Sequence, residues 1–459
     1  MQRFHERKKE FPTFNYSELK LKREQNYIEL RKSKRAQNSD KRRFAQIPET
    51  EPQNPFPEQN APKLQVAKTI RALVCQNPQI PETSAVVPQL VSFMQETSCP
   101  ELVYEATWAL TNLAAGNNSQ TLCIVNQGAI PVLVSLLDSP QPKIADQAIW
   151  AIANISADNP YSRDLVVKEG GLSKLLKHLT KGVSVWALAN ILRTRPYLDE
   201  ECLEPAVSKV LGILHQLDDN LVKECLWALA SNSDGRPHII INSGALERLV
   251  DFAQEPYLEP LLRIIGNVAC GDHEQTQSII TPTYLAAIKK GLTASCKFLR
   301  REAAWIVSNI SAGPTEHLEQ LYKSGIYCVV VTKVMVDFHQ IKREGVWTIV
   351  NCIANSNSEL LDKLVSIGFL DKLCGVLCST EAIVVFLGLE GVHRCLKKTN
   401  TQKAFKKLED CGGLFMIEKL HSHRNSQIRK KSHQIISEFF QEQPESPLQL
   451  TQGTFTFNI

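Results

Sequence analysis

The stretch ATWALTNLAAG, residues 106–116, decides the fold, because modified copies of it recur along the chain. The later copies are QAIWAIANISAD at 147–158, VSVWALANILR at 183–193, ECLWALASNSDG at 224–235, LLRIIGNVACGD at 261–272, REAAWIVSNISAG at 301–313 and REGVWTIVNCIAN at 343–355. All six tryptophans of the protein occupy one position of this repeat, and Arg263 takes that position in the fifth copy. Successive copies are 42, 36, 41, 36, 42 and 42 residues apart. A period near 40 residues is typical of stacked helical repeats.

The rest of the sequence supports a helical repeat array. Residues 63–441 show helical patterning throughout, broken by short segments such as NQGAIP, KEGG and SIGFL between the Asn-bearing helix and the next apolar helix. A glycine just past a helix commonly ends it in a left-handed conformation. A length of 459 residues also suits an array better than one compact core. We predict an all-α, armadillo-repeat superhelical solenoid of about ten repeats.

An asparagine lies four residues after the tryptophan position in most copies. Four residues is about one helical turn, so each Trp–Asn pair lies on one face of its helix. Asparagine is unfavourable inside helices, and the second copy has a separate apolar stripe of Ala148, Ile152 and Ile155. We therefore predict that the pairs line a concave surface that binds an extended peptide. The asparagines are Asn112, Asn154, Asn190, Asn267, Asn309 and Asn351.

The chemistry of these pairs suits a basic peptide. Each amide offers donors and acceptors to a peptide backbone. Neighbouring indoles would leave slots about one side chain wide, in which a Lys or Arg stem gains a cation–π contribution of about 0.5–2 kcal/mol. Nearby carboxylates would select cations, each contributing on the order of 1.5–3 kcal/mol. The candidate carboxylates are Asp158, Asp234, Asp272, Glu302 and Glu344.

Charge is unevenly distributed along the chain. Residues 1–43 contain 14 Lys+Arg and 6 Asp+Glu, and the remainder contains 38 and 42. The run at 16–35 has good helix formers but few apolar residues, which predicts a helix formed on a partner. We divide the chain into a basic segment (1–45), a Pro-rich linker (46–62), the solenoid (63–441) and a tail (442–459).

Several classes of protein are disfavoured by the sequence. The basic N-terminus lacks the apolar stretch of a secretory signal, and no apolar run has the length of a membrane span. The thirteen cysteines are scattered, so we expect them to be reduced and to serve as small, buried apolar side chains. Neither a phosphate-binding loop, a nucleophile elbow nor a metal-ligand pattern is present. We expect a binding protein with no enzymatic activity, cofactor, metal or membrane association.

Several stretches together resemble the importin-α family, the adaptors that carry proteins with basic nuclear localisation signals. ELRKSKR and KRRF resemble that family's importin-β-binding segment. GAIPVLVSLLDSP with WAIANISAD resembles its second and third repeats, and CGGLFMIEKLHSHRNSQI resembles its last repeat. The resemblance covers almost the whole chain. It implies a nuclear import adaptor that holds Lys/Arg-rich signals in its concave groove and links the cargo to importin-β.

The resemblance also implies roles for individual residues. The major signal-binding site would consist of Trp108, Asn112, Gly116, Thr121, Gln147, Trp150, Asn154, Asp158, Trp186 and Asn190. Its main lysine pocket would combine Asp158 and Thr121 with the backbone of Gly116. The minor site would consist of Arg263, Glu302, Trp305, Asn309, Glu344, Trp347 and Asn351. Importin-β binding and autoinhibition would use Lys22, Arg23, Arg31, Lys32, Lys34, Arg35, Lys41, Arg42 and Arg43.

Further expectations come from the same resemblance. Importin-β would bind the helix at 16–35, and residues 41–43 would occupy the major site in cis when importin-β is absent. Arg263 would separate the two sites by repelling a continuous basic ligand. An exportin-type receptor would return the protein, which would shuttle between cytoplasm and nucleus. The segment HLTKGVSVW before Trp186 is several residues shorter than the family pattern, and the family's C-terminal acidic cluster is missing.

Two alternatives remain open at this point. A catenin-like armadillo protein would bind acidic peptides in a basic groove, whereas the carboxylates named above favour basic ligands. Alternatively, residues 1–45 form a nucleic-acid-binding or nuclear-localisation arm, which would bind DNA with strong salt dependence. We expect no nucleic-acid binding.

Overall fold

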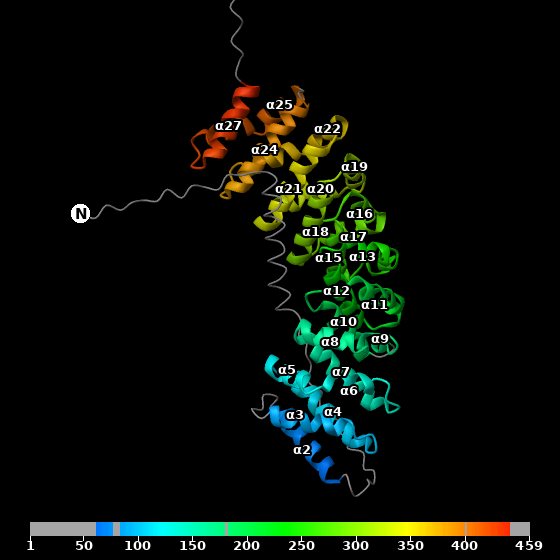
Figure 1. The fold of residues 1–459 in the computed structure, drawn as a ribbon. Coiled ribbons are helices and arrows are strands. Elements are labelled where there is room, and N and C mark those ends of the chain that lie inside the picture. Colours follow the sequence, from blue (N-terminus) through cyan, green and yellow to red (C-terminus); the bar gives the residue numbers. More distant parts are fainter. Residues whose placement is uncertain (1–60, 77–82, 180–181, 400–401, 441–459) are drawn as a thin grey trace, which may run out of the picture. The chain divides into compact units, whose positions relative to one another are not determined.

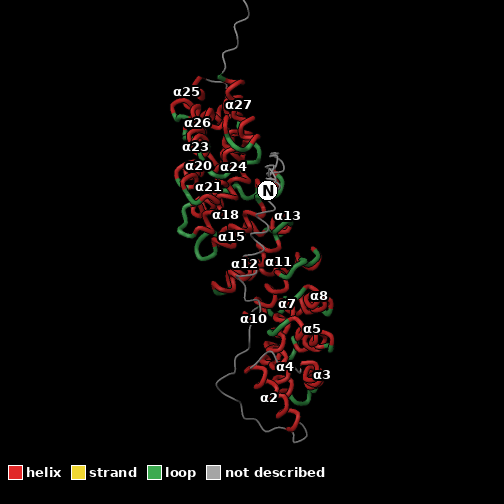
Figure 2. The backbone as a smooth tube through the Cα atoms, turned by 90° about the vertical axis from the view of Figure 1, so that its left-hand side faces the viewer, coloured by secondary structure: helices red, strands yellow, loops and turns green. Residues whose placement is uncertain are grey.

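The computed structural model describes residues 61–76, 83–179, 182–399 and 402–440. The chain divides into two compact units between residues 291 and 292. We call the described residues 61–291 the N-terminal unit and 292–440 the C-terminal unit, and treat each by itself. In both, the described backbone consists of helices joined by short loops, without a strand (Figure 2).

The N-terminal unit is a series of long and short helices. They are α2 (Ala61–Gln76), α3 (Thr83–Met94), α4 (Pro100–Ala114), α5 (Asn118–Asn126), α6 (Ala129–Leu136), α7 (Pro142–Asp158), α8 (Pro160–Lys168), α9 (Gly171–Leu175), α10 (Gly182–Arg193), α11 (Glu200–Ile213), η2 (Leu214–Gln216), α12 (Asp219–Asn232), α13 (Pro237–Asn242), α14 (Ala245–Leu249), η3 (Val250–Phe252), α15 (Leu258–Val268), α16 (His273–Gln277) and α17 (Pro282–Leu292).

The C-terminal unit continues the same pattern. Its helices are α18 (Lys297–Ile310), α19 (Thr315–Lys323), α20 (Ile326–Thr332), η4 (Val334–Val336), α21 (His339–Asn355), α22 (Ser358–Ser366), α23 (Phe369–Val376), α24 (Ala382–Thr399), α25 (Gln402–Asp410), α26 (Gly413–Lys419), η5 (Leu420–Ser422) and α27 (Ser426–Phe439).

One longer helix per repeat packs directly on the equivalent helix of the next repeat. We call these the ladder helices: α2, α4, α7, α10, α12 and α15 in the N-terminal unit, and α18, α21, α24 and α27 in the C-terminal unit. Figure 1 shows that, within each unit, every repeat adds its helices beside those of the repeat before it. The tryptophan phrase lies on the ladder helices from α4 to α21.

The predicted apolar stripe forms the core between the layers. Ala148, Ile152 and Ile155 of α7 are fully buried. Small and branched side chains at such positions let neighbouring helices approach closely, and each buried Ile or Leu stabilises the fold by about 1.5–3 kcal/mol. Buried side chains on all sides of α7 leave little of this helix in contact with water, including Asn154.

The predicted glycine turns are confirmed, with one refinement. Gly128 has a φ of 73° and lies between α5 and α6, where its left-handed backbone ends one helix and starts the next. The sequence analysis did not separate α5 from the ladder helix before it. Equivalent glycines with positive φ are Gly170, Gly244, Gly325, Gly368 and Gly412.

The cysteines fit the expectation only in part. All thirteen are free, and five of them are buried: Cys99, Cys225, Cys352, Cys374 and Cys395. Four are exposed, namely Cys270, Cys296, Cys328 and Cys378. In the described part of the chain, no single helix is long and apolar enough to cross a membrane, although the bent pair α5–α6 meets the length and composition criteria together.

Candidate peptide-binding ladder

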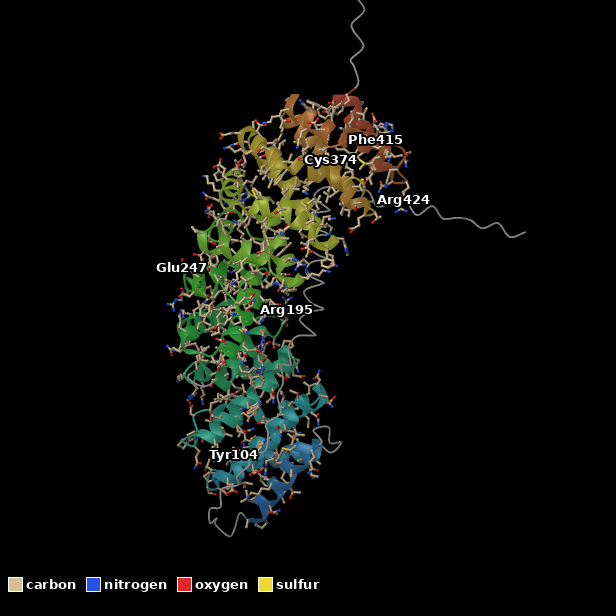
Figure 3. All side chains as sticks on the ribbon, turned by 180° about the vertical axis from the view of Figure 1, so that it is seen from behind. Tyr104, Arg195, Glu247, Cys374, Phe415 and Arg424 are labelled. Atoms are coloured by element: carbon tan, nitrogen blue, oxygen red, sulfur yellow. The ribbon has the colours of Figure 1, made fainter. Side chains whose placement is uncertain are left out.

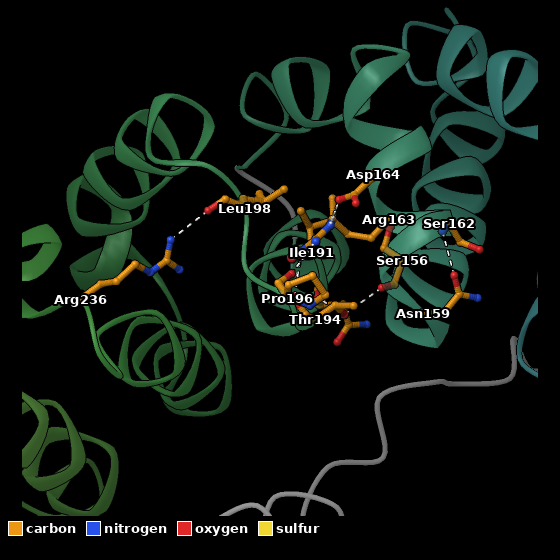
Figure 4. Close-up of polar contacts among 11 residues, drawn as sticks. Ser156, Asn159, Ser162, Arg163, Asp164, Ile191, Thr194, Pro196, Leu198 and Arg236 are labelled. Carbon is orange, nitrogen blue, oxygen red and sulfur yellow. Dashed lines mark hydrogen bonds and ion pairs between the residues drawn. The ribbon is translucent and has the colours of Figure 1, made fainter. Parts of the chain in front are cut away.

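The asparagines of the repeat connect successive ladder helices. The side-chain amide nitrogen of Asn154 donates to the Thr111 carbonyl at 3.1 Å, so α7 is tied to α4. Asn190 on α10 donates in the same way to Ala153 on α7 at 3.2 Å. Thr194 adds a hydroxyl bond to the Ser156 carbonyl, which places the C-terminal ends of α7 and α10 together (Figure 4). The two helices therefore run parallel.

This bond recurs in the other repeats, sometimes from a different position. Asn267 donates to the Ala230 carbonyl and Asn351 to the Ser308 carbonyl, each at 2.8 Å. In the fourth copy Asn232, five residues after Trp227, donates to Leu192 at 2.9 Å. Asn232 was not predicted, because the expected position, four residues after Trp227, holds Ser231.

The bonds correct part of the predicted chemistry. We expected the asparagine amides to be available to a peptide backbone as both donor and acceptor. One N–H of Asn154 is instead used to join α7 to α4, and both amide hydrogens of Asn267 are accepted, by the Ala230 carbonyl and the Ser233 hydroxyl. The repeated asparagine is therefore a structural link first, and any ligand role falls on the remaining amide groups.

The tryptophans are more deeply buried than an open row of rings would be. In the full chain, Trp108, Trp186, Trp305 and Trp347 are only 2–3% exposed. Trp150 and Trp227 are partly exposed. The indoles therefore contribute to packing between repeats as well as to any surface.

At Trp108, the first tryptophan of the ladder helices, a cation of this chain already contacts the ring. Arg71 on α2 lies over the Trp108 ring, 4.4 Å from its centroid, and its Nε is 2.5 Å from Glu105 Oε2. The ring centroid of Tyr104, which is labelled in Figure 3, lies 5.6 Å from that of Trp108. Burial raises the pKa of the Glu105 carboxyl, and Arg71 opposes that rise. The cluster shows that this indole accepts a guanidinium.

The predicted lysine pocket lies where the ladder helices α4 and α7 end. A Cβ added to Gly116 would meet Gln120 Oε1 at 2.0 Å, because Gln120 and Asn117 form the capping box of α5 there. Thr121 is buried and its hydroxyl bonds to the Asn117 carbonyl. Asp158 is partly exposed and accepts a hydrogen bond from the Asn159 amide at 2.7 Å.

Two of the other predicted carboxylates have structural partners. Asp234 binds Arg195 at 2.6 Å. Asp272 caps α16 by accepting from the Gln275 N–H, forming a capping box. Internal pairing of this kind lowers what each carboxylate can contribute to an external cation.

The third tryptophan lies against the second. The ring centroids of Trp150 and Trp186 are 6.3 Å apart, with the rings nearly perpendicular at 79°. Such edge-to-face contact leaves no room for a third side chain between two rings. The predicted slot between neighbouring indoles is therefore wrong for this pair. Gln147, also assigned to the major site, is buried, and its carbonyl accepts from the Thr111 hydroxyl.

The C-terminal end of α10 is held by arginines. Arg163 on α8 is buried and donates to the carbonyls of Thr194 at 2.8 Å and Pro196 at 2.6 Å (Figure 4). Arg193 donates to the Asn190 side-chain oxygen at 3.0 Å and lies 2.6 Å from Glu224 of α12. Arg195 follows on the same segment (Figure 3).

The predicted minor-site residues fall in both units. Arg263 lies on α15 in the N-terminal unit and is buried, and the remaining six residues lie on α18 and α21 in the C-terminal unit. Glu302 is fully buried, and Glu344, 2% exposed, accepts from the Ser308 hydroxyl at 3.2 Å. Asn309 is partly exposed. The two glutamates are therefore less accessible to a ligand than expected.

Other predictions lie outside the described residues. These include all the residues assigned to importin-β binding and autoinhibition, from Lys22 to Arg43. Among the residues that the structure describes, no three His, Cys, Asp or Glu side chains gather as metal ligands would.

Comparison with known proteins agrees with this architecture. The family model of the importin beta binding domain matches residues 7–107, the Armadillo/beta-catenin-like repeat matches 117–157 and the atypical Arm repeat matches 402–452. The crystal structure of an engineered protein superposes with a TM-score of 0.69 at 24% identity, covering 82% of this chain and 94% of that chain, which supports the fold alone. The predicted all-α armadillo solenoid is confirmed.

Sequence relatives identify the family. Importin subunit alpha-1a of Oryza sativa subsp. japonica is 31% identical, covering 95% of this chain and 91% of the relative. Importin subunit alpha-4 of Arabidopsis thaliana is also 31% identical, covering 80% and 72%. These matches favour the predicted resemblance over a catenin-like protein. The chain belongs to the importin-α family, which consists of nuclear import adaptors and not enzymes.

Proposed function

We propose that the adaptor binds Lys/Arg-rich nuclear localisation signals along the ladder helices α4 and α7. The observation that carries this proposal is the pair of consecutive Trp–Asn positions on these two packed helices, with Asp158 at the end of α7. The contact of Arg71 with Trp108 and Glu105 supports it, because it is the same kind of contact that a bound arginine would make.

Each part of the site has a definite role in this proposal. The side-chain oxygens of Asn112 and Asn154 accept N–H groups of the extended signal peptide. The exposed part of Trp150 supports the stem of a basic side chain, and Asp158 with the hydroxyl of Thr121 binds one lysine. A charge-assisted hydrogen bond of this kind contributes on the order of 1.5–3 kcal/mol.

A second, weaker signal site is proposed on α18 and α21, around Trp305, Asn309, Trp347 and Asn351. Asn351 is tied to α18 in the same way as Asn154 is tied to α4. The buried carboxylates of Glu302 and Glu344 attract a basic peptide there through their electrostatic field, without direct contact. Arg263 on α15 takes the tryptophan position of its repeat, and its positive charge disfavours a basic ligand at that repeat.

The basic segment 1–45 completes the adaptor in this proposal. Importin-β binds its helix at 16–35, and residues 41–43 compete for the major site when importin-β is absent. A flexible linker of about 20 residues has a root-mean-square reach near 25 Å. A linker with this reach holds residues 41–43 near the major site at a local concentration of order millimolar. An exportin-type receptor returns the protein to the cytoplasm, and neither nucleic acid nor a membrane is a partner.

Substitution of Asp158 tests the site directly. Asp158→Lys in the full chain should abolish the tighter, major-site binding of a five-residue basic signal peptide in calorimetry, because it replaces the lysine partner by a like charge. Asp234→Lys is the matched control, since Asp234 is paired with Arg195 in the structure. Tight binding that survives in the Asp158 variant, or that falls equally in both variants, would overturn the proposed site.

The competing segment has a separate test. Replacing Lys41, Arg42 and Arg43 together by alanine should tighten binding of the same peptide about tenfold or more, because the tethered competitor is removed. The control is importin-β binding, which depends on residues 16–35 and should be retained. Unchanged peptide affinity would remove the competition from the account and leave the signal site standing.

A further inference from the structure

The third ladder position differs from the first two in its spacing. Only 36 residues separate Trp150 from Trp186, compared with 42 between Trp108 and Trp150. The shortened repeat is accompanied by the edge-to-face contact of Trp150 and Trp186 at 6.3 Å. A side-chain stem needs about 3.5–4 Å to the atoms on each side of it, so it cannot enter between rings that already touch.

The polar half of this position is also occupied. The Asn190 amide nitrogen is bonded to the Ala153 carbonyl, and its oxygen accepts from Arg193 at 3.0 Å. Arg193 is 10% exposed, and its guanidinium also donates to the Ala189 carbonyl and lies 2.6 Å from Glu224. An oxygen that accepts this charged donor is no longer equivalent to the Asn154 oxygen for a peptide N–H.

The five other copies with an asparagine four residues after the tryptophan position have no basic residue at this point. Three residues after the asparagine the chain has alanine or cysteine: Ala115, Ala157, Cys270, Ala312 and Ala354. In the fourth copy, Arg236 likewise donates to the Asn232 side-chain oxygen at 3.3 Å, so in both repeats that follow α7 an arginine contacts the asparagine oxygen.

We propose that Arg193, together with the closed Trp150–Trp186 contact, ends the major site after α7 and so limits it to short basic clusters. The proposal rests on the proposed function of α4 and α7 as the signal site. Ladder helices pack about 8–10 Å apart, and an extended peptide rises about 3.3 Å per residue. Each repeat therefore corresponds to about three peptide residues. Without the Trp186–Asn190 position, the basic cluster that the major site can bind is shorter by about that number.

Peptide length provides the test. Two peptides with five and eight consecutive Lys/Arg residues, equal in total length, are titrated into the full-length chain at about 0.15 M salt. We compare the ratio of the two affinities, because competition by the basic segment weakens both peptides by the same factor and leaves the ratio unchanged. In the wild-type chain the eight-residue cluster should bind less than about threefold more tightly than the five-residue cluster. A ratio of tenfold or more would overturn the proposal without any variant.

Arg193→Met sharpens the test, because methionine keeps the aliphatic stem and removes the charge. The ratio should rise about five- to tenfold, because the Asn190 oxygen can then accept a peptide N–H and a positive charge beside the peptide is removed. Lys209→Ala, which removes an exposed positive charge on α11, should leave the ratio unchanged. An unchanged ratio in a folded Arg193→Met chain contradicts the proposal. Failure of both peptides to bind any of these chains contradicts the proposed function instead.

Discussion

The contacts α4–α7 and α7–α10 use the same link for different surfaces. In each, an asparagine amide donates to a carbonyl of the preceding ladder helix. At α4–α7 the tryptophans are 42 residues apart and Asp158 ends the second helix, whereas at α7–α10 the spacing is 36 and Arg193 ends it. The structural link of a repeat is thus separable from its ligand-binding groups, and one can persist where the other changes.

The C-terminal unit shows a third variation on this theme. Asn351 keeps the link to α18, while Glu344 is turned to the Ser308 hydroxyl. The spacing of 42 residues between Trp305 and Trp347 equals that of α4–α7. Repeat length alone therefore does not determine whether a carboxylate is accessible.

The largest expected difference between the contacts α4–α7 and α7–α10 is in stability, and Arg163→Met tests it. Arg163 is buried and binds the carbonyls that end α10, so its loss leaves several acceptors unsatisfied and should cost about 3 kcal/mol. We expect a lower urea midpoint and faster hydrogen exchange in α10. Lys174→Met is the control, because Lys174 also binds a carbonyl but is partly exposed. Equal effects of the two substitutions would contradict the role assigned to Arg163.

A smaller effect separates linking from binding. Asn154→Ala and Asn190→Ala each remove one bond to the preceding helix, so both should lower stability by about 1 kcal/mol. Asn154→Ala should also lower the affinity for a five-residue basic peptide about tenfold, whereas Asn190→Ala should change that affinity less than about twofold. Calorimetry and urea unfolding of both variants measure the two properties. Equal losses of peptide affinity would show that the third position is open.

The smallest effect concerns the C-terminal unit. Burial raises the pKa of Asp337, but hydrogen bonds from Arg300 and the Phe338 N–H outweigh it and leave the pKa lowered. The ionised carboxylate therefore contributes stability above its unfolded pKa near 3.9, and this is lost as the pH falls through the folded value. Asp337→Asn should cost about 1 kcal/mol at pH 7 and less in acid. A pH-independent difference between the variant and wild type would contradict this assignment.

Much of the fold followed from local sequence. The tryptophan period, the apolar stripe of α7 and the turn glycines such as Gly128 each predicted a feature that the structure confirms. These signals depend on spacing within one repeat, or between neighbours, and solenoids are built from such short-range contacts. The short helix α5 was missed although Gly116 and the capping residue Asn117 separate it from α4.

The site was less predictable because it depends on contacts between repeats. Nothing in the sequence around Asn154 reveals that its amide donates to the carbonyl of Thr111, 43 residues earlier. The pairing of Asp234 with Arg195 across 39 residues was equally hidden. The shortened segment before Trp186 was visible, but closure of the slot against Trp150 was not. Arg193 could have been noticed as the basic residue where five of the other six copies have alanine or cysteine.

The most direct measurement is a structure of the full-length chain with a bound eight-residue basic peptide. The account predicts a lysine at Asp158, peptide backbone bonded to Asn112 and Asn154, and the remaining basic residues unbound beyond α7. A basic side chain inserted between Trp150 and Trp186, with Arg193 displaced from Asn190, would contradict it.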